Sequence, residues 1–435
     1  MSKRLELNLN MSFFKEDWAF KIDFSKCKNF EDLFTYLDSV VIEDINVGEQ
    51  FRKMYTFPEN CPLLDTFIPL DTEGTSNSYI ADRGAGSYSF TATIMGNGVD
   101  GIIDEGKFED ASGNILTKAG GANIHPLSAK LLWQDTDELV EQVALVNGRV
   151  QVKMGRSRGN AVIAVYDKTN PNAEDAKVLW SWHLWCTATP KILEFVTSIY
   201  TGNNYKVMDR NLGATATKAY LGTVQGLHYQ WGRKDPLYPS NGMGNTTKIW
   251  YDKEGIPSTA NPMKGTFSAG NDCIKNCILN PNLMHNRYNG DYTYYNLWSA
   301  DNKTTSANDN PVNKTIYDPC PVGFKLPASN AFTGFTTTGE SVSSSTQVNG
   351  TWSSSEKGWY FYTNSEKTQS IFFPALGYRS YSTMRPGSIG TQGCFWSAHP
   401  VAKGNNYYLR TSSVDVQPTY MVDRGFGYAL RPCQD

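Results

Sequence analysis

Aromatic side chains suited to ligand binding gather in two short segments, KIWYDK at residues 248–253 and RYNGDYTYYNLWSAD at residues 287–301. Tyr and Trp offer a flat apolar face and a polar tip, which suits stacking on a carbohydrate or contact with a protein at a modest cost in entropy. The alternative is that these rings form the small core that a long loop needs to stay ordered. The pattern predicts a recognition surface made of Trp250, Tyr251, Tyr292, Tyr294, Tyr295 and Trp298.

Cysteine is a second residue type with potential chemistry, and one of the eight stands in a stiff segment. Cys320 lies between two prolines in DPCPVGFKLP, residues 318–327. Proline fixes its own φ and moves the preceding residue toward extended geometry, so the backbone is stiff on both sides of this thiol. Cys273 and Cys277, in CIKNC, have neither redox-motif nor zinc-ligand spacing. An even number permits disulfides without fixing their pairing, and the eight are Cys27, Cys61, Cys186, Cys273, Cys277, Cys320, Cys394 and Cys433.

The sequence lacks the common catalytic signatures. No Gly-x-Ser-x-Gly, His-Glu-x-x-His or P-loop pattern occurs, and the polar loop SADNKTTSANDN at 299–310 fails EF-hand spacing. A single histidine specifies no site, so His183 in VLWSWHLW is predicted to be buried and hydrogen-bonded. Paired carboxylates for glycoside hydrolysis are set only in three dimensions, which leaves a carbohydrate-active enzyme as a minor alternative. We therefore expect a protein that is not an enzyme and uses no cofactor or metal.

Length and composition narrow the class of protein further. A chain of 435 residues is long enough for two or three domains, and its hydrophobic fraction of 40% suffices for real cores. A net charge of −3 offers no basic stripe, so nucleic acid is not an expected partner. No run of about 18 apolar residues predicts a transmembrane helix. The N-terminal residues show no signal peptide, which fits either a cytoplasmic chain or one that lacks its original start.

Strand patterns fill the chain from about residue 46 to residue 200. SYSFTATI at 87–94 alternates, and AKLLWQD, RVQVKM, NAVIAVYD and VLWSWHLW follow, separated by polar turns. In VLWSWHLWC, aromatic mass falls on both faces, which predicts a strand covered on both sides. These short, regularly spaced strands indicate an antiparallel β-sandwich over 46–200. Residues 1–45 form a separate N-terminal segment that could be the remnant of a truncated domain.

After residue 200 the pattern becomes irregular, and it becomes regular again at residue 318. The stretch up to 317 is rich in Asn, Gly, Tyr and Thr with few strand-like runs. Beyond it, SNAFTGF indicates a helical turn, and WSSS, WYFYT, IFFPALGYRS, CFWSA, YYLRT and GYALRPC indicate strands. We expect a β-rich terminal domain over 201–435 with a long irregular insertion.

Six motifs of this terminal region resemble a known family. VMDRNLGAT, GLHYQWGRKDP, DPCPVGFKLPAS, WSSS, CFWSA and GFGYALRPC stand in the order found in the Fibrobacter succinogenes major paralogous domain, which occurs in surface proteins of Bacteroidetes and is related to the C-type-lectin-like fold. Upstream, NSYIADRGAGSYSF and VLWSWHLW are similar to the β-sandwich of fimbrillin-type pilus tip proteins. The resemblance implies a mainly β chain, with a sandwich followed by an α+β lectin-like domain.

The same resemblance implies a disulfide and a function. Lectin-like folds join their first helix to their last strand by a disulfide, here Cys320–Cys433, which would stabilise by about 4–5 kcal/mol less any strain. The sequence departs from the family at Asn330-Ala331-Phe332, where an acidic-aromatic pair is usual. Gln417-Pro418-Thr419 also lacks the carboxylate of calcium-dependent sugar sites, so a calcium-bridged sugar site is not supported.

We therefore expect a cell-surface or fimbrial tip adhesin of the outer membrane that binds a host or bacterial glycan or protein through the lectin-like domain. Its other expected partners are fimbrial subunits. The alternative is a structural pilus subunit or anchor that binds no ligand of its own, with donor-strand addition to a sheet edge as its mode of assembly.

Overall fold

The chain divides into two compact units, Met1–Thr66 and Phe67–Asp435. In the first unit, β1 (Val41–Ile42) and β2 (Ile45–Asn46) form an antiparallel pair. The computed structural model describes residues 36, 39, 41–42, 45–46, 67–82, 86–103, 108–116, 119–217, 224–237, 250–251, 257–258, 272–285, 296–300 and 304–435.

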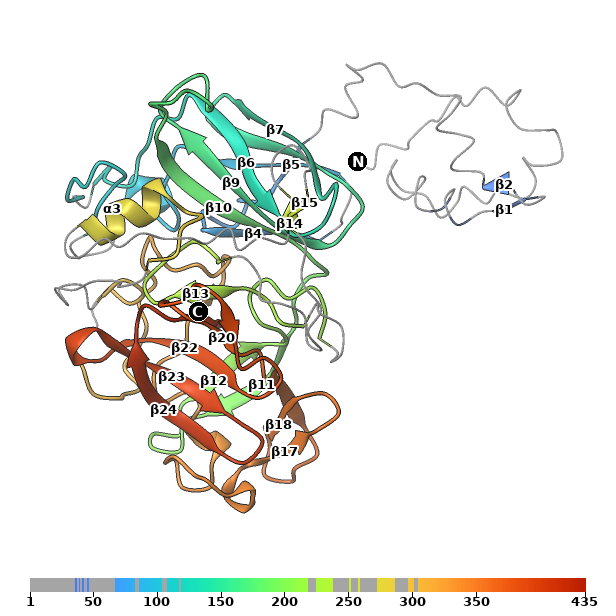
Figure 1. Ribbon diagram of the computed structural model, residues 1–435, viewed down its shortest axis with the longest axis vertical. Helices are drawn as coiled ribbons and strands as arrows, with labels where there is room; N and C mark the ends of the chain where they lie inside the picture. The colour runs from blue at the N-terminus through green and yellow to red at the C-terminus, as the bar shows by residue number, and fades with distance from the viewer. Residues whose placement is uncertain are drawn as a thin grey trace, which may run out of the picture. The chain divides into compact units, whose positions relative to one another are not determined.

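The second unit is mainly β, as the sequence predicted, and begins with a pair of sheets drawn in blue and green in Figure 1. One sheet has the order β3-β5-β8-β7, made of Ile68–Pro69, Gly86–Thr91, Arg149–Met154 and Val140–Val146. The other has the order β15-β14-β6-β9-β10-β4, made of Pro257–Ser258, Trp250–Tyr251, Ser128–Gln134, Gly159–Tyr166, Val178–Cys186 and Ser78–Ala81. Pairing is antiparallel except for β3 with β5 and β4 with β10, which run parallel.

Strand β10 is covered on both faces, as its two-sided aromatic pattern predicted. Trp182 lies 5.4 Å from the ring of Phe90 in the facing sheet. On the opposite face, Trp185 donates a hydrogen bond of 3.2 Å to the carbonyl of Ala214. Every residue of β10 except Leu179 is buried. One face of the strand packs against the facing sheet of the sandwich, and the other packs against the segment that follows residue 200.

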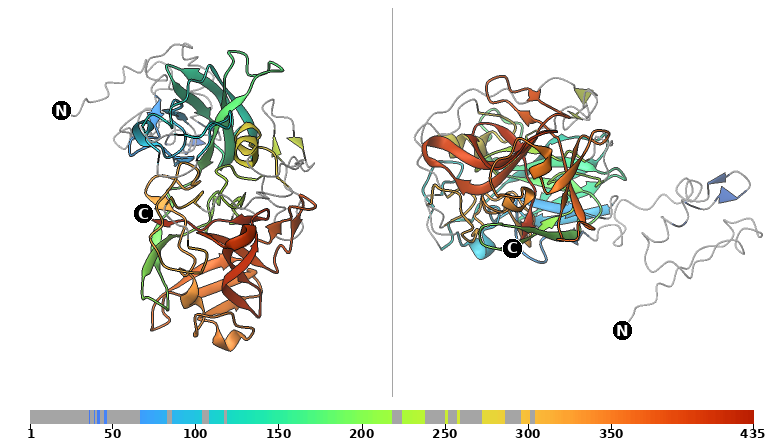
Figure 2. Two further views of the ribbon diagram at one scale, coloured as in Figure 1. Left: turned by 90° about the vertical axis from the view of Figure 1, so that its left-hand side faces the viewer. Right: turned by 90° about the horizontal axis from the view of Figure 1, so that it is seen from below.

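The C-terminal region, which begins with β11 at Ile192, is built around further sheets whose strands are coloured from green through orange to red in Figures 1 and 2. The largest has the order β21-β20-β25-β22-β23-β24, with β13 also paired to β25; these are Pro386–Gly387, Tyr378–Arg379, Gly427–Ala429, Gly393–Pro400, Asn405–Thr411, Val416–Asp423 and His228–Gln230. A three-stranded sheet has the order β17-β18-β19, made of Gly350–Ser353, Gly358–Tyr362 and Ser370–Pro374. A four-stranded sheet has the order β11-β12-β26-β16, made of Ile192–Thr197, Asn204–Met208, Cys433–Gln434 and Phe324–Lys325.

Short helical elements complete this region. The 3-10 helix η4 (Thr333–Phe335) lies where the sequence indicated a helical turn. The stretch predicted to be irregular also contains α3 (Asp272–Leu279), whose apolar residues Ile274, Cys277 and Ile278 are buried. Across the described residues, no helix has the length and hydrophobicity needed to cross a membrane.

Two hydrophobic cores lie within the second unit. The larger one joins sandwich residues such as Trp180 and Trp182 to residues of the C-terminal region such as Trp231, Trp298 and Tyr428. The smaller one is rich in phenylalanine, and its rings of Phe335 and Phe361 stack at 3.8 Å between centroids. The larger core therefore spans the two regions that the sequence predicted as separate domains, 46–200 and 201–435.

Candidate functional site

The predicted aromatic recognition surface is not assembled by the described residues. Trp298 is 0% exposed and its ring lies 5.4 Å from that of Trp231, so it belongs to the core and has no surface for a ligand. Tyr251 is half-buried, and β14, which it forms with Trp250, pairs with Gln134 of the sandwich. The remaining predicted residues, Tyr292, Tyr294 and Tyr295, lie outside the described residues.

The predicted disulfide is not formed, because Cys320 and Cys433 are both free, buried thiols. Their segments are nevertheless adjacent, since Cys433 pairs with Lys325 across β26 and β16. Burial raises the pKa of Cys320, and it raises the pKa of Cys433 to about 12. Strand pairing between β16 and β26 holds these segments together without a covalent link.

Hydrogen bonds from the sandwich hold the proline-flanked backbone around Cys320 in place. Ser76 Oγ donates to the carbonyl of Cys320 at 2.9 Å, and Ser78 Oγ donates to that of Pro319 at 2.6 Å. Asp318 Oδ1 accepts from the amide of Cys320 at 2.7 Å. The proline-flanked turn therefore presents carbonyl groups to the sandwich, and docking is its structural role.

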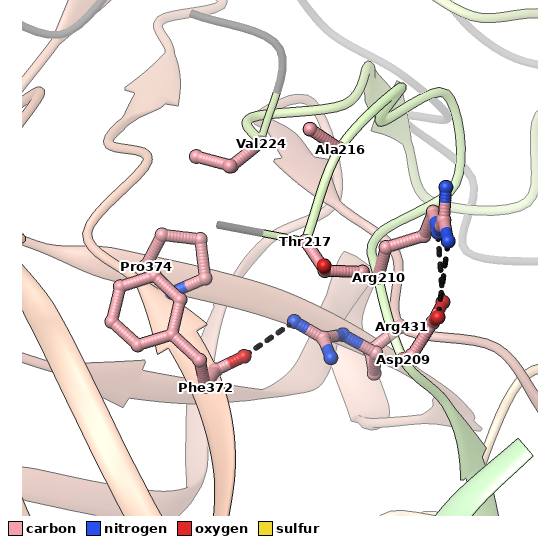
Figure 3. A pocket seen from close by; sticks show the side chains of 8 residues that line it. All are labelled: Asp209, Arg210, Ala216, Thr217, Val224, Phe372, Pro374 and Arg431. Atoms are coloured by element: carbon pink, nitrogen blue, oxygen red, sulfur yellow. Dashed lines mark hydrogen bonds and ion pairs between the residues drawn. The ribbon is translucent and has the colours of Figure 1, made fainter. Parts of the chain in front are cut away.

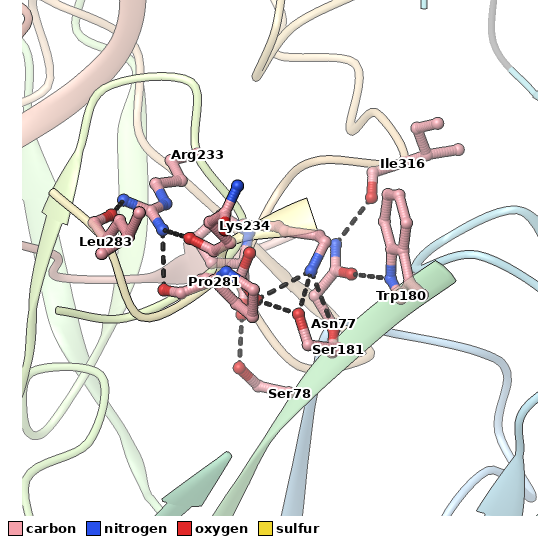
Figure 4. A network of polar contacts seen from close by, with 12 residues as sticks. Asn77, Ser78, Trp180, Ser181, Arg233, Lys234, Pro281, Leu283 and Ile316 are labelled. Carbon is pink, nitrogen blue, oxygen red and sulfur yellow. Dashed lines mark hydrogen bonds and ion pairs between the residues drawn. The ribbon is translucent and has the colours of Figure 1, made fainter. Parts of the chain in front are cut away.

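A buried network near this turn contains a serine and a lysine in contact (Figure 4). Lys234 Nζ donates to Ser181 Oγ at 2.6 Å, and Ser181 Oγ donates to Asp235 Oδ1 at 2.5 Å. Lys234 Nζ also lies 2.7 Å from Asp235 Oδ1 and 4.4 Å from the centroid of the Trp180 ring. Burial lowers the pKa of Lys234, while the charge of Asp235 opposes that shift.

Serine beside a lysine of lowered pKa is an arrangement used by some hydrolases. Here Ser181, Lys234 and Asp235 are at most 3% exposed, and neither of the two hollows characterised below is lined by them. The neighbouring Arg233 also makes structural hydrogen bonds: its guanidinium donates to the carbonyls of Pro281 at 2.7 Å and of Leu283 (Figure 4). The network thus fastens the segment after residue 230 to β10, and a substrate could not reach it.

A small hollow beside Arg431 is also structural (Figure 3). It offers about 10 Å³, which is room for about one water molecule. Arg431 donates to Asn211 Oδ1 at 2.8 Å, to the carbonyl of Met208 at 3.2 Å and to that of Phe372 at 2.8 Å. Burial lowers its pKa to about 9, with Asp209 opposing the shift. These bonds to neutral acceptors anchor the segment before β26.

The second hollow is large enough for a small ligand and is here called the polar hollow. Its volume is about 210 Å³. It lies in the C-terminal region, between β11, η4, the residue before β17 and the turn from β18 to β19. It is lined by Val196, Thr197, Gly334, Phe335, Asn349, Tyr362, Thr363, Asn364 and Ser365.

Local structure fixes the walls of the polar hollow. At Gly334 the backbone approaches β11 so closely that a Cβ would clash with the carbonyl oxygen of Thr197. Asn349 Nδ2 donates to the carbonyls of Gly334 at 3.1 Å and of Tyr362 at 3.4 Å, which ties η4 to β18. In the turn, Asn364 Oδ1 accepts from the backbone amides of Thr368 and Gln369, each at 3.0 Å.

The polar hollow offers hydrogen bonding without charge. Thr197, Tyr362, Asn364 and Ser365 supply hydroxyl and amide groups to its lining. Thr363 Oγ1 is itself shielded from solvent and has no hydrogen-bond partner among the described residues. Phe335 and Val196 add apolar surface, and no lining side chain is a carboxylate, an amine, a guanidinium or an imidazole. Sequence reasoning missed this site, because its residues come from four separate segments and form no local motif.

The described ranges contain no group of three His, Cys, Asp or Glu side chains placed to hold a metal ion. No protein-family model, no curated protein and no solved structure matches the chain.

Proposed function

We propose that the chain is a cell-surface binding protein, an adhesin that contacts a ligand on another surface through its C-terminal region. The observation that carries the proposal is the polar hollow, whose lining combines apolar side chains with hydroxyl and amide groups. A hollow that combines apolar walls with a few fixed polar groups is typical of sites that bind small groups. The resemblance to lectin-like domains of surface proteins points the same way, and a fimbrial tip is the location that it suggests.

The framework of the polar hollow also suits binding. Its floor residue Phe335 stacks on Phe361 in the smaller core, and its turn is held by the hydrogen bonds of Asn364. A site on such a rigid base loses little conformational entropy when a ligand binds, which preserves affinity.

The test is capture of surface ligands by the full chain and by a variant with a filled hollow. Ser365 is exposed at the rim, so Ser365→Trp places a large ring in the hollow without disturbing the core. We expect the full chain to bind glycans on an array or proteins in a pull-down from host or bacterial surfaces, and Ser365→Trp to lose at least tenfold in affinity.

Ser354→Trp is the matched control. Ser354 is also exposed, and it lies in the turn between β17 and β18, at the other end of β18. It should bind as the unaltered chain does. Failure of the full chain to bind any glycan or surface protein would contradict the proposal and favour the structural pilus subunit instead.

A further inference from the structure

We propose that the small hollow beside Arg431 binds a single halide ion, chloride in ordinary buffers, which acts as the counter-ion of the buried guanidinium group. The inference goes beyond the proposed function, because it concerns a second site with its own lining residues. Three observations carry it: the charge of Arg431 is not neutralised, some of its N–H groups have no acceptor, and the hollow has room for one small ion.

The positive charge of Arg431 has no net counter-charge beside it. The side chain is 1% exposed, and its hydrogen bonds go to an amide oxygen and two backbone carbonyls, all of which are neutral. The other charged residues that line the hollow are Asp209 and Arg210. They pair with each other through both carboxylate oxygens, at 2.8 and 3.0 Å. The lining therefore carries one positive charge in excess.

The pKa of Arg431 reflects this environment. Burial lowers the pKa to about 9; the charge of Asp209 opposes the shift, and the charge of Arg210 adds to it. The guanidinium group is thus still protonated at neutral pH, in surroundings that disfavour its charge. A buried charge without a partner costs free energy, and a bound anion would recover part of that cost.

The guanidinium group also has donors to spare. It carries five N–H groups in a planar fork, and Nε, Nη1 and Nη2 each make one hydrogen bond. One N–H on Nη1 and one on Nη2 are therefore left without an acceptor among the described residues. The ring of Phe373 covers a face of the group at 4.3 Å. An anion would bind at the edge of the fork, where these N–H groups lie.

The size of the hollow restricts the anion to a single atom. Its volume of about 10 Å³ holds about one water-sized particle, so a carboxylate, sulfate or phosphate is too large. Figure 3 shows Arg431 between Phe372 and the pair of Asp209 and Arg210. Thr217, which also lines the hollow, is exposed. The hollow therefore reaches the surface, which allows an ion somewhat larger than water to enter and to exchange with solvent.

The test is thermal unfolding of the full chain in mixtures of sodium chloride and sodium gluconate at constant ionic strength. Gluconate is too large to enter the hollow. A ligand that binds only the folded chain raises the thermal midpoint with the logarithm of its concentration, so we expect a rise of about 2 °C for each tenfold increase in chloride above its Kd. Bromide should act in the same way. In crystals grown in bromide, its anomalous signal should lie beside Arg431.

Ala216→Leu is the variant that blocks the site. Ala216 is half-buried and lines the hollow, so a larger side chain there fills the space and leaves Arg431 unaltered. The dependence of the midpoint on chloride should disappear. Ala173→Leu is the matched control, because Ala173 is also half-buried, lies in the turn between β9 and β10 and does not line the hollow. This variant should keep the dependence, which separates binding from the general effects of salts on stability.

Equal midpoints of the unaltered chain in chloride and in gluconate would mean that water fills the hollow, and the inference would be overturned. The same chloride dependence in Ala216→Leu and in the unaltered chain would also overturn it. Bromide found only at other places would show an adventitious ion only. If Ala216→Leu did not fold, the unaltered chain and the bromide signal would still decide. Surface capture through the polar hollow does not depend on any of these results, so the proposed function stands or falls separately.

Discussion

His183 lies in the middle of β10 with 1% of its surface exposed, and both ring nitrogens have partners. Nδ1 is 3.1 Å from Ser78 Oγ, and Nε2 is 2.9 Å from Asn160 Oδ1. The prediction of a buried, hydrogen-bonded histidine is confirmed. Burial lowers the pKa of His183 to about 3, so the ring is neutral across the physiological range and links β10 to β4 and β9.

This pKa makes stability depend on pH. The unfolded chain binds a proton at His183 near pH 6.5 and the folded chain only near pH 3. The stability from neutral His183 is therefore fully present above about pH 6.5 and is lost as pH falls toward 3. Between pH 7 and pH 5 we expect a loss of about 2 kcal/mol from this residue, measured by urea unfolding of the unaltered chain and of His183→Gln.

The variant supplies the comparison, because His183→Gln has no group that titrates in this range. Its own loss between pH 7 and pH 5 should be smaller than that of the unaltered chain by about 2 kcal/mol. His399, whose pKa burial lowers to about 4, contributes equally to both proteins and cancels. Equal losses in the two proteins would show that His183 does not govern the pH dependence.

At the scale of elements, the contact between β11 and η4 forms one wall of the polar hollow. Gly334→Ala puts a methyl group against the carbonyl of Thr197, and this backbone group can move aside only at a cost in free energy. We expect a loss of about 1–3 kcal/mol in the free energy of unfolding, together with weaker ligand capture. Chemical denaturation and the surface-capture assay measure the two effects.

Gly387→Ala is the control for this substitution. A Cβ there would meet only the outer atoms of the Tyr378 ring, at 3.0 Å or more, and these can move aside. Its cost should be clearly smaller than that of Gly334→Ala, and capture should not change. A Gly334→Ala protein as stable as the unaltered chain would mean that the approach of η4 to β11 is not tight.

Elements with strong alternation could be predicted from the sequence, whereas elements defined by their neighbours could not. The runs RVQVKM and NAVIAVYD coincide with β8 and β9 to within a residue. Strand β24 was missed, because Pro418 argues against a strand interior; it is tolerated here because β24 stands last in its sheet. The helix α3 had a detectable signal in the spacing of Ile274, Cys277 and Ile278.

The candidate site was less predictable than the elements, for a physical reason. The aromatic residues were identified by their type alone, and type does not determine burial: Trp298 pairs with Trp231 in the core. Thr363 and Asn349 read as ordinary turn residues, and only the packing of β11, η4 and β18 makes them neighbours. A site of this kind becomes visible only when long-range packing is known.

At the scale of the whole second unit, the sandwich and the C-terminal region are joined by a core and by buried polar contacts. Asn77 shows the connection most directly. Its Nδ2 donates to the carbonyls of Ile316 at 2.6 Å and of Asp318 at 2.8 Å, and its Oδ1 accepts from Trp180 Nε1 at 2.9 Å. Because the larger core also spans both regions, we expect residues 67–435 to unfold in one cooperative step.

Replacing Asn77 tests this cooperativity. Asn77→Leu keeps the volume but leaves two carbonyls and the Trp180 indole N–H without this partner in a buried place. We expect the free energy of unfolding to fall by about 3 kcal/mol or more. In hydrogen-exchange mass spectrometry, the slowest amides of β22 and β23, which are remote in sequence from Asn77, should lose the same amount of protection as those of β9, because all exchange through one global opening.

Asn172→Ala, at an exposed position of the sandwich region, is the control and should leave the protection of both sets of amides unchanged. Loss of protection in β9 with full protection in β22 and β23 would mean that the two regions unfold as independent domains.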